Sequence, residues 1–108
     1  MATTYKVLGQ SNPSATTATT LYTVPSATET VVSTIVVANQ TTAGSYRIAI
    51  RPDGESLASK HYIAYDVALA ANETHTYTIG ATLNAADVIT VYASSASQSF
   101  NAFGSEIA

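Results

Sequence analysis

The sequence predicts an all-β protein: one antiparallel β-sandwich or jelly-roll-like domain of about eight short strands, with an N-terminal arm. Threonine accounts for 17 of the 108 residues and occurs with many Val, Ile and Tyr, the residue types that suit a pleated, half-buried surface. Apolar and polar residues alternate in several runs, and turn-forming residues separate these runs. The length corresponds to a single domain over residues 1–108.

The first half of the chain contains four predicted strands. They are Thr4–Leu8, Leu21–Val24, Glu29–Asn39 and Tyr46–Arg51. Between the first two lies Gly9–Thr20, a polar stretch with an Asn-Pro pair, small hydroxyl residues and almost nothing to bury. We expect this stretch to form a loop or an extended arm.

The second half contains four more predicted strands. They are Tyr62–Leu69, Thr74–Ile79, Asp87–Ala93 and Ser99–Ile107. The strongest turn signal is Pro52-Asp53-Gly54, because proline presets φ and glycine accepts a positive φ. The only plausible helical segment is one turn at Glu55–Lys60. Short strands at this spacing favour an antiparallel sandwich over alternating strands and helices, although the strand order does not follow from the sequence.

Residue alternation assigns faces to several strands. In Tyr46–Arg51, alternate apolar residues share one face, while Arg47 and Arg51 share the other. In the run that begins at Tyr62, one face is predicted to carry Ile63, Tyr65, Val67 and Leu69, and the other Ala64, Asp66 and Ala68. Glu29–Asn39 breaks the alternation, so it is either buried on both faces or contains a bulge.

The overall composition excludes several classes of protein. The chain has no cysteine, which excludes a disulfide scaffold, thiol catalysis and cysteine-ligated metals. Four Lys and Arg against seven Asp and Glu give a net charge of −3, which opposes binding to nucleic acid. No apolar run has the length of a membrane span, and no signal peptide is visible at the N-terminus, so no membrane partner is expected.

The residues that could carry chemistry form no known catalytic pattern. His61, Asp66 and His75 are the residue types of a metal or acid–base site, yet their spacing does not hold two ligands on one face. No serine-hydrolase or phosphate-binding motif occurs. We therefore predict a protein that is not an enzyme, with no catalytic residues, no metal and no cofactor.

Interaction with other protein chains fits the composition better. Only 10% of the residues are charged, so strand edges have few charges that would repel a second chain. Seven tyrosines offer large rings with polar tips, which favour interfaces and sugar-binding faces as well as ordinary packing in a sheet. Arg47 and Arg51 either bind a partner subunit or pair with Asp66 or Glu55 within the chain. The candidate interface consists of Asn12, Pro13, Tyr46, Arg47, Arg51 and Tyr62.

Several of these segments also resemble a known family, the small virion structural proteins of tailed phages, cyanophages among them. The resemblance extends from Thr20 to the C-terminal end. It is carried by Thr20–Pro25, Glu29–Asn39, Tyr46–Gly54, Tyr62–Asp66, Asp87–Ala93 and Phe103–Ile107. These are framework segments of a β-sandwich, and no catalytic residues come with them.

The resemblance implies a component of a phage particle that is present in many copies. We favour a head decoration or cement protein on the outer surface of the head, which binds the major capsid protein as a homo-oligomer, with a trimer favoured. A subunit associated with the tail, neck, baseplate or fibre, which could recognise host-surface glycans, is the alternative. In the first case the arm would lie across a neighbouring subunit and add main-chain hydrogen bonds.

Overall fold

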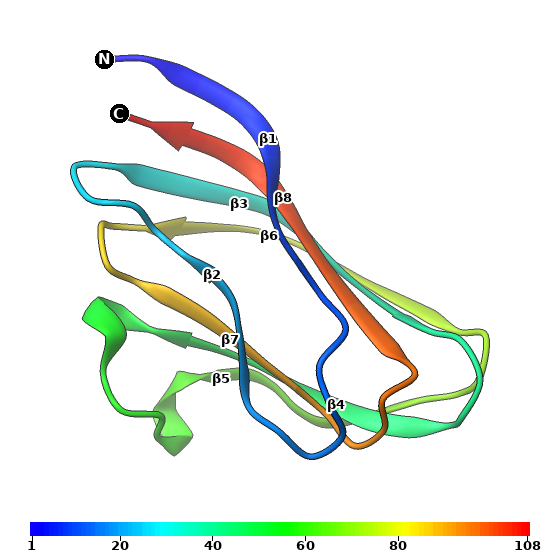
Figure 1. The fold of residues 1–108 in the computed structure, drawn as a ribbon. Coiled ribbons are helices and arrows are strands. Elements are labelled where there is room, and N and C mark those ends of the chain that lie inside the picture. The colour runs from blue at the N-terminus through cyan, green and yellow to red at the C-terminus, as the bar shows by residue number, and fades with distance from the viewer.

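The computed structural model describes all residues, Met1–Ala108, and confirms the predicted fold class. Eight strands form two antiparallel four-stranded sheets that pack face to face (Figure 1). The strands are β1 (Thr3–Ser11), β2 (Thr19–Thr23), β3 (Glu29–Asn39), β4 (Gly44–Arg51), β5 (Tyr62–Leu69), β6 (Thr74–Leu83), β7 (Val88–Ala93) and β8 (Gln98–Ile107). No helix is long or apolar enough to cross a membrane.

The strand order is that of a jelly roll. One sheet, here called sheet A, has the order β1-β8-β3-β6, and the other, sheet B, has the order β2-β7-β4-β5. The chain therefore changes sheet at every connection except the one between β4 and β5. This interleaving of two four-stranded sheets is the double Greek key of jelly rolls. The two chain ends lie side by side, joined by main-chain hydrogen bonds between Ala2 and Ala108 (Figure 1).

One hydrophobic core fills the space between the sheets. Its largest fully buried side chains include Tyr46 and Phe100, whose rings meet edge to face with centroids 6.1 Å apart. Aliphatic residues from both sheets surround them, among them Ile35, Ile48 and Ile89. The aromatic pair contributes about 0.5–1.5 kcal/mol beyond the burial of its area.

Register shifts occur in several strand pairs, and those in β3 and β5 bear on the predicted faces. In β3 the register shifts between Val32 and Thr34, which confirms the bulge that the broken alternation suggested. In β5 the register against β4 shifts near Asp66, which has a positive φ of 50°. The extra residue turns Tyr65 outward, whereas Val67 and Leu69 face the core. The prediction that Tyr65 shares a face with Leu69 was therefore wrong, because a bulge inverts the alternation that follows it.

The predicted loop or arm at Gly9–Thr20 is much shorter than expected. Gly9–Ser11 belong to β1 and pair with β8, and Thr19 and Thr20 belong to β2 and pair with β7. Only the seven residues between these strands form a connection. It lies along its own domain, because the Asn12 amide donates hydrogen bonds to the carbonyls of Ala96 and Gln98. Hydrogen bonds inside the domain thus occupy the segment that was expected to reach a neighbour.

The helical turn predicted at Glu55–Lys60 is also absent. Two short 3₁₀ turns, Pro52–Gly54 and Ser59–His61, flank an irregular segment instead. The Arg51 guanidinium donates a hydrogen bond to the Glu55 carbonyl at 2.9 Å, so a side chain occupies an acceptor that a helix would use. The turn predicted at Pro52-Asp53-Gly54 is confirmed, with positive φ at Asp53 and Gly54.

Candidate functional site

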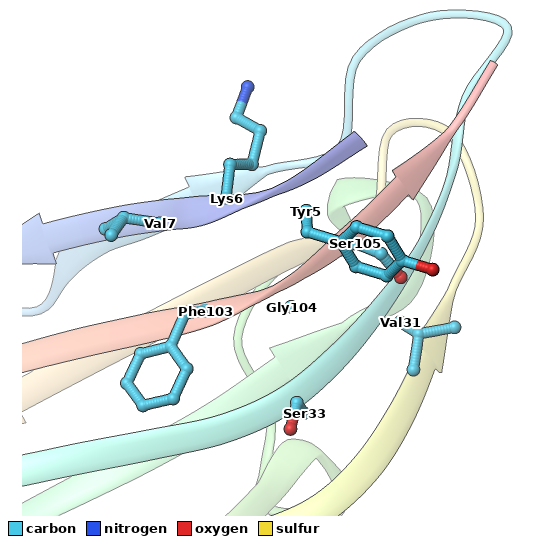
Figure 2. A pocket seen from close by; sticks show the side chains of 8 residues that line it. All are labelled: Tyr5, Lys6, Val7, Val31, Ser33, Phe103, Gly104 and Ser105. Atoms are coloured by element: carbon cyan, nitrogen blue, oxygen red, sulfur yellow. The ribbon is translucent and has the colours of Figure 1, made fainter. Parts of the chain in front are cut away.

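The outer face of sheet A carries a group of exposed apolar side chains. Tyr5 and Val7 on β1 are 83% and 53% exposed, and Phe103 on β8 is 38% exposed. Tyr5 pairs with Ser105, and Val7 pairs with Phe103, so these residues lie on the same face of the two strands. Val31 on β3, which pairs with Ser105, completes the group, here called the apolar patch (Figure 2). Contiguous exposed apolar surface of this kind marks sites of interaction with other molecules.

The residues around the apolar patch have short side chains, and nearly all of them are uncharged. Ser33, Gly104 and Ser105 line a shallow hollow between the larger side chains (Figure 2). Lys6 is the only charged residue of the hollow's lining, and its side chain points away from the patch, where its ammonium group forms an ion pair with Glu106 at 3.1 Å (Figure 2). A surface of short side chains loses little conformational entropy on contact, which favours the close approach of another protein.

The outer face of sheet B carries a different arrangement, built around Arg47 on the central strand β4. The guanidinium carbon lies 4.2 Å from the ring centroid of Tyr65 on β5 and 4.3 Å from that of Tyr92 on β7. Arg47 also donates two hydrogen bonds to the Asp66 carboxylate, at 2.6 and 3.3 Å. These bonds raise the pKa of the guanidinium above its ordinary value, so Arg47 stays charged.

Tyr62 extends this arrangement along β5. Its ring meets that of Tyr65 nearly at a right angle, with centroids 4.8 Å apart. Tyr65 is 56% exposed, and together with Tyr62 and Ser59 it lines an open hollow. We call Arg47, Tyr62, Tyr65, Asp66 and Tyr92 the tyrosine–arginine cluster.

The connection between β4 and β5 folds over sheet B beside this cluster. Ala49, Val88 and Thr90 on the outer face are buried, and Arg51 donates hydrogen bonds to Thr90 and to the Glu55 carbonyl. The buried His61 accepts a hydrogen bond from the Ala58 amide at Nδ1, so its Nε2–H donates to Glu55 at 3.2 Å. This bond lowers the pKa of the Glu55 carboxyl, as does the neighbouring Lys60. These contacts hold the loop in place next to the cluster, where its residue Ser59 lines the hollow with Tyr62 and Tyr65.

The predicted interface residues do not form one surface. Arg47 and Tyr62 lie close together in the tyrosine–arginine cluster, and Arg51 fastens the adjacent loop. Tyr46 was predicted at the interface but is completely buried, because its side of β4 faces the core. Pro13 is also buried, and the Asn12 amide is bonded within its own domain, so neither residue supports the predicted arm contact.

Arg47 and Arg51 were expected either to bind a partner subunit or to pair within the chain, and in the structure both have partners within the chain. Arg47 pairs with Asp66, as one reading predicted. Arg51 binds the main-chain carbonyl of Glu55 rather than its carboxylate. Both guanidinium groups therefore donate hydrogen bonds to acceptors within the chain.

The two histidines belong to separate environments. His61 lies in the loop over sheet B, whereas His75 lies on β6 of sheet A, where it bonds the Tyr46 hydroxyl through Nδ1 at 2.8 Å. Asp66 is engaged by Arg47. No group of three His, Asp or Glu side chains is placed so that it could hold a metal ion.

Sequence reasoning missed Tyr5, Val7, Phe103 and Tyr65. For Tyr5 and Val7 the sequence contained a signal, because the two alternate with Lys6 in the predicted strand Thr4–Leu8 and therefore share one face. Tyr65 was hidden by the bulge, and an Asp in mid-strand, a residue type that tolerates positive φ, was the available clue.

Comparison with known proteins adds no relative from which a function could be transferred. No protein-family model, curated protein or solved structure matches this chain.

Proposed function

We propose that this protein is a non-enzymatic structural protein of a tailed-phage particle, a decoration or cement subunit that binds the outer surface of the head as an oligomer. The resemblance of its framework segments to small virion proteins supports this role. So does the jelly roll, an architecture that recurs in viral capsid proteins. Because a fold alone does not define a function, the proposal depends on a specific surface.

The observation that carries the proposal is the apolar patch on sheet A. Three of its side chains, Tyr5, Val7 and Phe103, are exposed to solvent in the isolated chain. Each gains free energy on burial, at about 25 cal/mol per Å² of apolar surface removed from water. The one neighbouring charge is already paired with Glu106, so a partner need not supply a counter-charge.

A second copy of this chain is the occupant that the patch fits best. The patch borders β1, which is an edge strand of sheet A and presents unpaired main-chain groups along its free side. β1 contains no proline, and its only charged side chain is held by Glu106. A contact between this edge and a different surface of the next copy closes into a ring, and a trimer is the ring that we favour.

Binding of many oligomers to a repeating lattice does not require a large contact for each copy. Once one subunit of an oligomer is bound, the others are held at a high effective concentration near the lattice. The mechanism is thus burial of surface and pairing of edges, without a chemical reaction. The major capsid protein is the proposed lattice partner.

A subunit of the tail, neck, baseplate or fibre is the second candidate. The observation that favours it is the tyrosine–arginine cluster, since an exposed tyrosine and two half-buried ones beside a fixed arginine are typical of recognition surfaces. A surface of this kind would serve contact with the host, which the tail makes.

Immunogold labelling of purified virions tests the proposal. An antibody raised against this chain is expected to label the heads densely in electron micrographs. Label confined to the tail or neck would replace the head role by the second candidate. Particles that contain the chain by mass spectrometry establish a virion role even where the epitope is covered, and particles that lack it contradict the proposal.

A further inference from the structure

A second hollow, on sheet B, has the composition of a small-molecule site. It is open, has a volume of about 340 Å³ and is lined by Ser59, Tyr62 and Tyr65. This volume lies at the lower end of the range for ligand pockets, which is about 300–1,000 Å³. Two tyrosine rings at a right angle form a corner, and the Ser59 side chain adds a hydroxyl at its border.

The walls of this hollow are held in place before any ligand arrives. Tyr65 is stacked on Arg47, which is itself fixed by Asp66 and by the ring of Tyr92. Ser59 begins a 3₁₀ turn whose last residue, His61, is buried and bonded to Glu55. A site whose side chains are already ordered loses less entropy on binding.

Electrostatics restrict the class of ligand. The positive charge of Arg47 is matched by Asp66, and Lys60 lies 3.4 Å from the Glu55 carboxylate. No unpaired charge therefore points at a ligand, and the chain as a whole carries a charge of −3. The hollow consequently favours a neutral ligand over an anion such as phosphate or an acidic peptide.

We infer that this hollow binds one neutral pyranose ring of a glycan. A pyranose presents a face of C–H groups that can pack on a tyrosine ring, and a rim of hydroxyls that exchange hydrogen bonds with Ser59 and the tyrosine hydroxyls. A protein partner would need to bury about 800 Å² of this surface, more than the three lining residues supply. The inference does not depend on the head role proposed above, since the cluster and the apolar patch lie on opposite sheets, and it names a ligand class for the surface on which the second candidate rests.

The test is a titration of the ¹⁵N-labelled protein with methyl pyranosides of glucose, galactose, mannose and N-acetylglucosamine, followed by NMR. At least one sugar is expected to cause saturable shifts, at millimolar dissociation constants, in the amides of Ser59, Tyr62, Tyr65 and their neighbours. Tyr65→Ala should weaken binding about tenfold, the equivalent of one stacked ring. Tyr65→Phe keeps the ring and should bind within about threefold of the wild type.

Tyr5→Ala is the matched control, because it removes an exposed tyrosine from the other sheet and should leave sugar binding unchanged. Well-dispersed spectra of each variant establish that it is folded. Absence of saturable shifts with all four sugars, or unchanged binding by Tyr65→Ala, would overturn the inference. The oligomeric state, measured on the same samples, reports separately on the apolar patch.

Discussion

The hydroxyl of Tyr22 on β2 donates a hydrogen bond to the carboxylate of Glu106 on β8 at 2.5 Å, so a partly buried contact connects the two sheets. The same hydroxyl lies 2.8 Å from the Thr30 hydroxyl on β3. Burial, and then the bond to Glu106, raises the pKa of Tyr22 to about 12. In turn, the bond from Tyr22 lowers the pKa of the Glu106 carboxyl, with a further contribution from Lys6.

This contact predicts a loss of stability in acid. Since the pKa of Glu106 is lower in the folded than in the unfolded chain, ionisation of Glu106 favours folding at every pH above the unfolded value, about 4.3. That contribution disappears as the pH falls through the lowered pKa. We expect Glu106→Gln to flatten the decline in unfolding free energy below about pH 4.3, as measured by urea denaturation. If the unfolding free energy of Glu106→Gln declined in acid as steeply as that of the wild type, Glu106 would not be the source of the decline.

A second prediction concerns the buried hydroxyl of Tyr46. It bonds His75 at 2.8 Å and Tyr77 at 2.5 Å, and burial, then the bond with Tyr77, raises its pKa above the ordinary value. Tyr46→Phe keeps the ring in the core and removes both bonds, so we expect a loss of about 1–2 kcal/mol in unfolding free energy. Tyr5→Phe, on an exposed tyrosine, should change it by less than about 0.5 kcal/mol. Equal effects of the two substitutions would show that the buried hydroxyl stabilises nothing.

The N-terminal segment gives a third prediction. Deletion of Met1–Thr20 removes β1, which pairs with β8, and two residues of β2. We expect the shortened chain to lose its β-sheet circular dichroism, because sheet A loses an edge and the core loses Leu8 as a cover. Deletion of Met1 alone is the control and should leave the spectrum unchanged. A shortened chain with the full sheet signal would restore the prediction of an extended arm outside the folded core.

A fourth prediction tests the close approach of β8 to β3. A Cβ added at Gly104 would meet the main-chain carbonyl of Val31 and lie 2.9 Å from the amide nitrogen of Ser33. Neither atom can move away without disturbing the β3 bulge. We expect Gly104→Ala to lower the unfolding free energy by about 1–3 kcal/mol. Ser105→Ala, next in the strand, should have little effect, and thermal unfolding of the two variants compares them directly.

The sequence predicted the strands well because their signal is local. Alternation located β5 to the residue, a long run rich in Val and Ile located β3, and Pro52-Asp53-Gly54 located the turn after β4. Strand order is set by which faces bury each other across the whole chain, so the jelly-roll order was not readable. The length of the arm was overestimated because Gly9–Ser11 carry no large apolar side chain. They nevertheless pair with β8 through main-chain hydrogen bonds, which do not require one.

The candidate surfaces were only partly predictable for a related reason. The alternation of β4 placed Arg47 on an outer face, but its contact with Tyr65 depends on the positive φ of Asp66. Alternation placed Tyr46 on the apolar face of its strand, opposite Arg47, and the structure buries that face in the core, so its prediction as an interface residue went against a signal in the sequence. The apolar patch required the pairing of β1 with β8, two segments at opposite ends of the chain.

The central claim, assembly of copies through the apolar patch, is tested most directly by light scattering coupled to size-exclusion chromatography. The wild-type chain is expected to elute with the mass of three copies, and the double substitution Tyr5→Ser with Phe103→Ser with the mass of one. Tyr65→Ser, on the opposite sheet, should keep the oligomer. A monomeric wild type, or an oligomer that survives the double substitution, would contradict the account.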